Sequence, residues 1–310
     1  MLKKALLLLF VLFNMSIFAE SIKVLVPDGL PALSLVNIMS DSKIENIDME
    51  YKVEKLSDAL VVDMLKREGD IAIIPSNFAA QLYNKNLDYK ILGTIGWGSF
   101  YVVSREGISS LEELRGKEIY TFGKGLTPDI ILQTILNKKG LTQKEVKINY
   151  LANGNEVVSL YLSKKIDTIV IPEPMLSKVL SKSLVSNVVA NLNDEWKHIV
   201  NSDLGYPQAT LVVKSEIYNS NPELIKSFIS QLSKSISILY KEPEVTVENI
   251  KRNKLGIDTT ILTDILKRAN IYYTPIVDCK EEYNKYFEIL ENTNRKVIGG
   301  KLPDEEIYAK

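Results

Sequence analysis

A strand–helix unit occurs twice in this chain at nearly constant spacing. Residues Asp70-Ile-Ala-Ile-Ile-Pro75 are typical of a short buried strand that ends at a proline, and Asp167-Thr-Ile-Val-Ile-Pro172 repeats the pattern 97 positions later. Apolar residues at helical spacing precede each strand, and a second helix is expected after each proline. Since strands alternate with helices in both copies, the pattern predicts an α/β protein with two similar halves.

A second pair of turns strengthens the repeat. Gly29-Leu30-Pro31 follows an expected strand over 22–26, and Gly125-Leu126-Thr127-Pro128 follows one over 118–121 at a similar offset. Glycine ends the strand and proline opens the helix, as its fixed φ favours. We therefore expect two lobes, each built on a parallel, doubly wound sheet.

Two segments are expected to carry the chain between the lobes. Tyr89–Ser104 is strand-rich and contains Gly96, Trp97 and Gly98, and Tyr206-Pro207 precedes another strand. These two crossovers divide the chain into a first part of lobe 1 (20–98), lobe 2 (99–205) and a return to lobe 1 with C-terminal helices (206–310).

The first 19 residues have the layout of a secretory signal peptide. Lys3 and Lys4 precede nine apolar residues, and Ala19 offers a small residue before the expected cleavage. The apolar run is too short to span a bilayer, although an N-terminal anchor is the alternative. The mature protein is expected in the periplasm, as a monomer.

Composition limits the chemistry available. Lys plus Arg number 38 against 39 Asp plus Glu, so no basic excess supports nucleic-acid binding. The chain has one histidine, His198, and one cysteine, Cys279. We expect His198 on the surface and Cys279 as a partly exposed thiol, so we predict no catalytic residue, no metal site and no cofactor.

Four turns are expected where strands end: 28–32, 75–77, 123–128 and 172–174. In open α/β sheets ligands bind beyond the carboxyl ends of the strands, where helix N-termini offer free N–H groups. A ligand that touched turns of both lobes would favour their closure.

With these features and the motifs Gly-Leu-Pro-Ala-Leu (29–33), Ile-Ile-Pro-Ser-Asn (73–77) and Ile-Pro-Glu-Pro (171–174), the chain resembles the type II substrate-binding proteins of ABC importers. It is most similar to the group that binds sulfonates, taurine, nitrate and thiamine precursors. The resemblance implies a two-lobed periplasmic-binding-protein fold, a small-molecule ligand between the lobes, and a membrane permease and ATPase as partners. It implies ligand contacts at Gly29, Pro31, Ala32, Ser76, Asn77, Thr127 and Glu173.

Four further residues are candidates from their chemistry. Trp97, Tyr101 and Tyr206 offer flat apolar surface, and Lys124 is the only cation in the four turns. Each candidate has a structural alternative. Ser76 and Asn77 would cap a helix, Glu173 would stabilise a helix N-terminus, the aromatic residues would be core, and Lys124 would be a solvated surface lysine.

The ligand remains open between a planar nitrogen compound, favoured by the aromatic residues and Glu173, and a sulfonate-like anion, favoured by helix N-termini and Lys124. Two other functions also remain open. One is an enzyme of the same fold, of the pyrimidine-precursor or lyase type, and the other is a sensory receptor that presents its ligand to a signalling protein.

Overall fold

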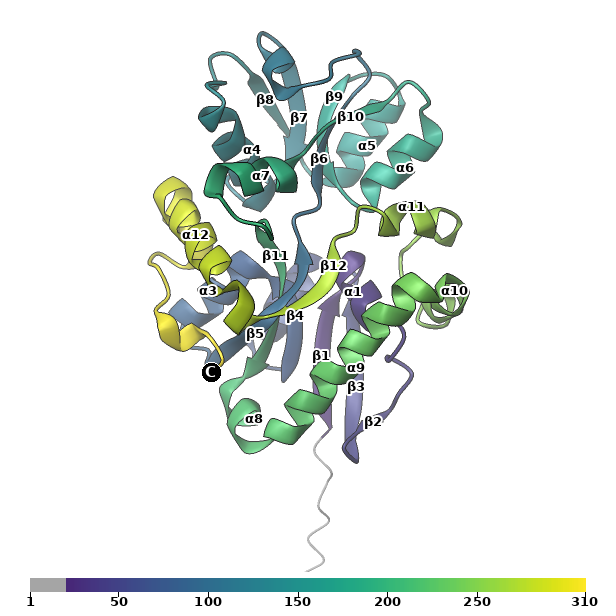
Figure 1. The fold of residues 1–310 in the computed structure, drawn as a ribbon, viewed down its shortest axis with the longest axis vertical. Helices are drawn as coiled ribbons and strands as arrows, with labels where there is room; N and C mark the ends of the chain where they lie inside the picture. The colour runs from purple at the N-terminus through teal and green to yellow at the C-terminus, as the bar shows by residue number, and fades with distance from the viewer. Residues whose placement is uncertain (1–20) are drawn as a thin grey trace, which may run out of the picture.

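The computed structural model describes residues 21–310, apart from the side chain of Ser57. The predicted signal peptide, residues 1–19, therefore lies outside the described residues. Two sheets form two lobes, with lobe 2 above lobe 1 in Figure 1. None of the helices found over residues 21–310 combines the length and the apolar character that crossing a membrane requires.

Lobe 1 is built on a seven-stranded sheet. Its spatial order is β12 (Ile271–Pro275), β5 (Tyr89–Trp97), β11 (Pro207–Lys214), β4 (Ile71–Pro75), β1 (Ile22–Pro27), β3 (Ile47–Glu54) and β2 (Lys43–Ile44). Its helices are α1 (Leu30–Leu35), α2 (Ser57–Leu65), α3 (Ser76–Asn84), α8 (Ser215–Ser220), α9 (Pro222–Lys241), α10 (Pro243–Arg252), α11 (Leu262–Leu266) and α12 (Ile276–Asn294). Short 3₁₀ turns lie at Thr259–Ile261, Arg295–Ile298 and Glu305–Ile307.

Lobe 2 is built on a five-stranded sheet. Its spatial order is β10 (Asn187–Asn191), β6 (Phe100–Ser104), β9 (Thr168–Pro172), β7 (Glu118–Phe122) and β8 (Lys147–Leu151). Its helices are α4 (Thr127–Lys138), α5 (Gly154–Leu162), α6 (Met175–Lys182) and α7 (Leu192–Val200), with a 3₁₀ turn at Leu111–Leu114.

Both sheets are mixed, so the expectation of parallel sheets was wrong in part. The repeated strands are parallel, β1 to β4 and β7 to β9. The crossover strands run the other way, with β11 antiparallel to β4 and β6 antiparallel to β9. The chain passes between the lobes at the carboxyl ends of the repeated strands. A strand that enters a new sheet from this end, as β6 and β11 do, therefore runs opposite to the repeated strands.

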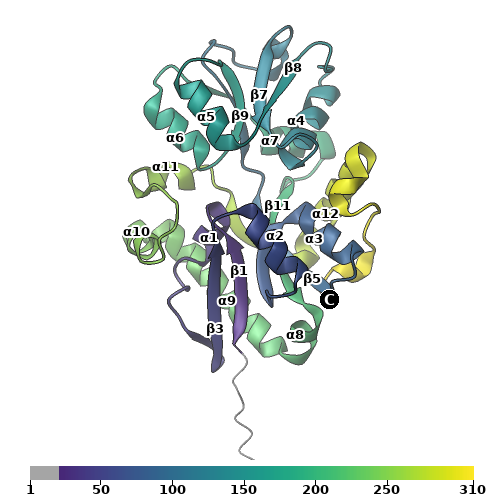
Figure 2. The same cartoon turned by 180° about the vertical axis from the view of Figure 1, so that it is seen from behind.

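The apolar core continues from one lobe into the other. One buried cluster joins α3 and α12 of lobe 1 to α4 and α7 of lobe 2, and its members include Tyr206, Trp196 and Tyr286. A second cluster lies under α1 and α9 within lobe 1, and a third under α5 and α6 within lobe 2. In Figure 1, α12 lies beside α7 and α4, and Figure 2 shows the same arrangement from behind. The lobes are therefore packed together on the α12 side.

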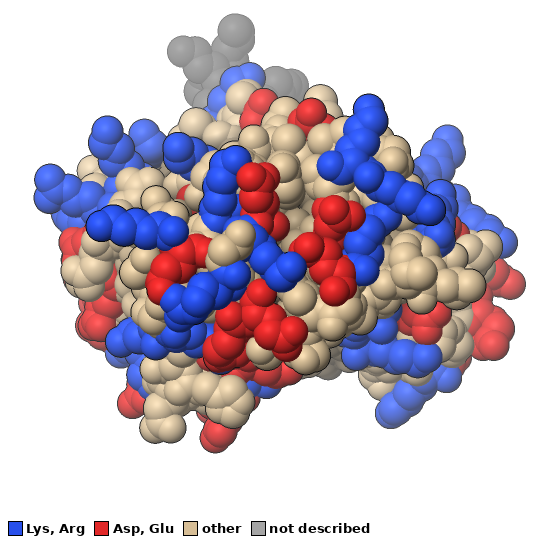
Figure 3. All heavy atoms as spheres, turned by 90° about the horizontal axis from the view of Figure 1, so that it is seen from above, with Lys and Arg blue, Asp and Glu red and all other residues tan. Residues whose placement is uncertain are grey.

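The surface charge is mixed in sign. Figure 3 looks onto the end of lobe 2, where Lys and Arg alternate with Asp and Glu. A polyanion would need a continuous basic area, which this face does not offer.

Candidate functional site

The carboxyl ends of the repeated strands meet at the junction between the lobes. Pro75 at the end of β4 pairs with Ala209, and Pro172 at the end of β9 pairs with Phe100. Both partners lie beside the crossovers, where Gly98 N donates to Tyr206 O at 3.1 Å. The repeated strands of both lobes therefore end toward the junction, while the turns 75–77, 123–128 and 172–174 contribute no residue to the cavity described below.

Glycine is required at this junction because the two crossovers approach closely. A Cβ on Gly98 would lie 2.3 Å from the Tyr206 ring and 2.4 Å from Asn193 Oδ1. Gly205 has φ +104°, and a Cβ there would lie 2.1 Å from Asn193 Oδ1. The Asn193 amide in turn accepts from Tyr206 N at 3.1 Å, so one lobe 2 side chain holds the second crossover in place.

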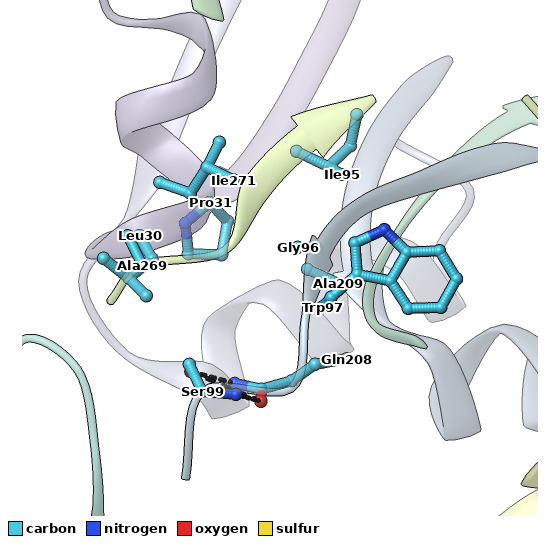
Figure 4. A pocket seen from close by; sticks show the side chains of 10 residues that line it. All are labelled: Leu30, Pro31, Ile95, Gly96, Trp97, Ser99, Gln208, Ala209, Ala269 and Ile271. Carbon is cyan, nitrogen blue, oxygen red and sulfur yellow. Dashed lines mark hydrogen bonds between the residues drawn. The ribbon is translucent and has the colours of Figure 1, made fainter. Parts of the chain in front are cut away.

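A cavity lies at the junction, beside the turn from β1 to α1 (Figure 4). It is lined by Leu30, Pro31, Ile95, Gly96, Trp97, Ser99, Gln208, Ala209, Ala269 and Ile271. Its volume of about 30 Å³ gives room for about two water molecules. This space is too small for an organic ligand.

Of the lobe 1 candidates in the first turn, only Pro31 lines the cavity. Gly29 begins α1 with φ +105°, and open space surrounds the position of a Cβ there. Ala32, on α1, is fully buried in the lobe 1 core, and it does not line the cavity.

The side chains of Ser76 and Asn77 are engaged within lobe 1. Ser76 Oγ lies 2.5 Å from Thr210 Oγ1, and Asn77 Nδ2 donates to Val297 O at 3.2 Å. Neither side chain caps α3, so the capping alternative was wrong. Both residues are buried and neither lines the cavity.

Of the three aromatic candidates, Trp97 is among the residues that line the cavity, and Tyr101 and Tyr206 are not. The Trp97 ring points away from it in Figure 4, stacks on Tyr272 and donates from Nε1 to Thr274 Oγ1 at 3.3 Å. Tyr206 is fully buried against Trp196 and Tyr286. Tyr101 is buried in lobe 2 and its hydroxyl donates to Arg268 O at 2.9 Å. All three side chains are buried near the junction of the lobes, which agrees with the structural alternative that they belong to the core between the lobes.

The lobe 2 candidates Lys124 and Thr127 both lie near other residues of the protein, and Lys124 is exposed to solvent. Lys124 Nζ lies 5.3 Å from the centre of the Tyr150 ring. Thr127 Oγ1 lies 3.0 Å from the hydroxyl of Tyr286, which comes from α12 of lobe 1. Thr127 therefore marks an inter-lobe contact, and neither residue lines the cavity.

Glu173 forms an ion pair across the two lobes. Its carboxylate accepts from Arg268 Nε at 2.7 Å, from Ser177 Oγ at 2.9 Å and from Ser177 N at 3.1 Å. The Glu173 side chain is 0% exposed and that of Arg268 is 25% exposed. Burial raises the pKa of Glu173, and the bonds from Arg268 and Ser177 oppose this shift. Glu173 does sit at the N-terminus of α6, and its charge is already paired.

The loop between α11 and β12 is the part of the site that sequence reasoning missed. Arg268 Nη2 donates to Ser177 Oγ at 2.8 Å, Ala269 and Ile271 line the cavity, and Asn270 Nδ2 donates to Gly98 O at 2.7 Å. This loop belongs to lobe 1 and touches both lobe 2 and the first crossover. Arg268 lies outside the four expected turns, so no local motif marked it.

The single histidine and cysteine lie away from the cavity. His198 is exposed on α7, as expected. Cys279 is fully buried, so the expectation of a partly exposed thiol was wrong. Its thiol donates to Pro275 O at 3.3 Å, and burial raises its pKa to about 11.

Comparison with known proteins gives matches over most of the chain. A family model described as NMT1/THI5 like matches residues 55–246. A solved structure described as an ABC transporter from Parabacteroides distasonis is 27% identical, covers 94% of this chain and 99% of its own, and has a TM-score of 0.80. The periplasmic aliphatic sulphonate binding protein SsuA from Escherichia coli is 13% identical, with 92% and 93% coverage and a TM-score of 0.71.

A Brucella abortus protein described as a binding protein is 27% identical over 166 residues, which are 51% of this chain and 48% of that protein. The chain thus spans about half the length of the curated relatives that it matches. At 13% identity the likeness to SsuA concerns the fold. The predicted two-lobed periplasmic-binding-protein fold is confirmed.

Proposed function

This chain belongs to the NMT1/THI5-like family, and from that premise we propose that it is the solute-binding component of an ABC importer. It binds a small organic molecule between its lobes, closes on it, and delivers it to a membrane permease with its ATPase. The observation that carries the proposal is the cavity at the junction of the lobes, next to the turn that ends β1. Cavities at such strand ends are the usual ligand sites of open α/β sheets.

The small volume of the cavity means that the lobes must open to admit a ligand and close again around it. Two crossovers connect the lobes, so a hinge at Gly98–Ser99 and at Gly205–Tyr206 separates them and widens the space. A ligand that contacts both lobes stabilises the closed form by the difference in its affinity for the two forms. The P. distasonis structure described as an ABC transporter, which covers 94% of this chain, supports the importer role.

We propose that the work of the site is binding and that the chain is not an enzyme. The chemically reactive side chains support this, because exposed His198 and buried Cys279 both lie outside the cavity lining. The site would act in the periplasm after removal of residues 1–19. The mature protein would act as a monomer.

A thermal-shift screen against small metabolites tests the function. A ligand at 100 times its dissociation constant should stabilise the protein by about 2.7 kcal/mol. The ligand should also reduce the radius of gyration in solution scattering, and mass spectrometry should recover it unchanged. If no small molecule raises the melting temperature, the chain is not a solute-binding protein. If the ligand is converted, the chain is an enzyme.

A further inference from the structure

The charged side chains beside the cavity are already paired within the protein. The lining of the cavity contains no charged side chain among residues 21–310. Two ion pairs flank it: Arg268–Glu173 next to Ala269, and Lys55–Asp28 next to the turn that carries Leu30 and Pro31. A ligand in the cavity therefore meets neutralised pairs.

Both members of the Arg268–Glu173 pair make further hydrogen bonds with Ser177. Three donors reach the Glu173 carboxylate, one from Arg268 Nε and two from Ser177. A second guanidinium nitrogen of Arg268 donates to Ser177 Oγ at 2.8 Å. Two of the five guanidinium N–H groups are thus engaged, and the Glu173 carboxylate already supplies the counter-charge that an anionic ligand would otherwise provide.

The charged groups of the second pair, Lys55–Asp28, also make further hydrogen bonds within the protein. Lys55 Nζ donates to Asp28 Oδ2 and to Lys254 O, each at 2.7 Å. Asp28 Oδ1 also accepts from Gly29 N at 2.9 Å and from Gly256 N at 3.0 Å. A charged ligand group would have to break one of these pairs or remain unpaired, and an unpaired buried charge is costly.

One end of the cavity is polar. Gln208 Oε1 accepts from Ser99 N at 2.9 Å, and Gln208 Nε2 donates to Ser99 Oγ at 3.0 Å. Figure 4 shows these two residues together at one end of the space, away from Ile95. The other lining residues carry no charge and are mainly apolar: Leu30, Pro31, Ile95, Gly96, Trp97, Ala209, Ala269 and Ile271. A primary amide has two N–H donors, so Gln208 retains one for a ligand.

We propose that the ligand of this cavity is an uncharged molecule, apolar over most of its surface, with one hydrogen-bonding group that faces Ser99 and Gln208. This proposal rests on the proposed function and names the ligand class of the same site. Of the two ligand classes that the sequence left open, it disfavours the sulfonate-like anion and allows a planar nitrogen compound only in an uncharged form.

Matched pairs of ligands test the proposal. A library of small carboxylic acids, each with its own primary amide, is titrated at pH 7 against the full mature chain; benzoate with benzamide and nicotinate with nicotinamide are two such pairs. We expect at least tenfold tighter binding of the amide in every pair that binds. Tighter binding of the acids would overturn the ligand class and leave the proposed function intact. Binding by no member of this library or of the metabolite screen would remove the proposed function itself.

A variant tests whether the ion pair sets this preference. Glu173→Gln keeps the shape and frees the charge of Arg268, so the acids should bind about tenfold more tightly than they bind wild type. Asp264→Asn is the matched control, because it frees Lys267 from a pair of 2.9 Å in which both side chains are more than half exposed. The control should leave every dissociation constant unchanged. An unchanged acid affinity in Glu173→Gln would overturn the proposed role of the pair.

Discussion

Arg268 of lobe 1 donates from Nε to Oε1 of Glu173 in lobe 2 at 2.7 Å, and the carboxylate end of this bond is fully buried. The bond joins the lobes at a third place, after the two crossovers. On the opposite side, Tyr286 of α12 reaches Thr127 of α4. The arrangement of the lobes in the structure is therefore held from two sides by the protein's own side chains.

Removal of the guanidinium should destabilise the protein strongly. Arg268→Met leaves Glu173 buried without its counter-charge, and such losses cost about 3–5 kcal/mol. Urea unfolding should show the decrease in the free energy of unfolding. Lys267→Met is the control, because its exposed pair with Asp264 contributes at most about 1 kcal/mol. Equal effects of the two variants would contradict the role given to the pair.

The free energy of unfolding should carry a pH dependence due to Glu173. Burial raises the pKa of this carboxyl in the folded protein, so the folded state holds its proton more tightly than the unfolded state. The stability from this group is full below the unfolded pKa and is lost as pH rises through the folded pKa. Urea unfolding between pH 4 and 7 should show wild type losing stability relative to Glu173→Gln as pH rises. Parallel curves for the two proteins would contradict the raised pKa.

The junction should not tolerate a methyl group at Gly98. Gly98→Ala places a Cβ 2.3 Å from the Tyr206 ring, and overpacking of this kind costs about 1–3 kcal/mol. Gly96→Ala is a graded control, because its Cβ would lie 3.3 Å from Ala209 and has one contact to relieve. Thermal unfolding should show the larger decrease for Gly98→Ala. The reverse order would show that the two crossovers are not packed as described.

Thr127 and Tyr286 should be coupled across the lobes. Each of Thr127→Val and Tyr286→Phe removes one partner of the 3.0 Å hydrogen bond and should cost about 1 kcal/mol. The double variant should cost clearly less than the two single costs together, because the bond is lost only once. Costs that add to within about 0.3 kcal/mol would indicate that the hydroxyls do not interact in solution.

The repeated strand–helix units were predictable because their signals are local. The buried runs that end at Pro75 and Pro172 became β4 and β9, with a helix on each side as expected. Strand β3 (Ile47–Glu54) was missed because four of its eight residues are acidic or basic, which masks a strand pattern. Strand β12 (Ile271–Pro275) was missed because nothing in a run of five residues marks a sheet edge.

The site was less predictable because its contacts join distant parts of the chain. Arg268 and Glu173 are 95 positions apart, and neither local sequence indicates the other. Trp97 and Tyr206 could belong to the core or to a ligand cleft, because their side chains are large and mainly apolar. In the structure Trp97 packs against Tyr272, and Tyr206 packs against Trp196 and Tyr286. Turn motifs located the strand ends, whereas the side chains that line the cavity depend on how the two lobes pack against each other.

Native mass spectrometry of the chain purified from its own cells tests most directly whether the lobes hold a small molecule at their junction. Wild type should carry the mass of one small molecule. Ala209→Leu, which extends a side chain that lines the cavity, should fold with an unchanged circular dichroism spectrum and lose that mass. A small molecule retained in full by Ala209→Leu would contradict this location of the site.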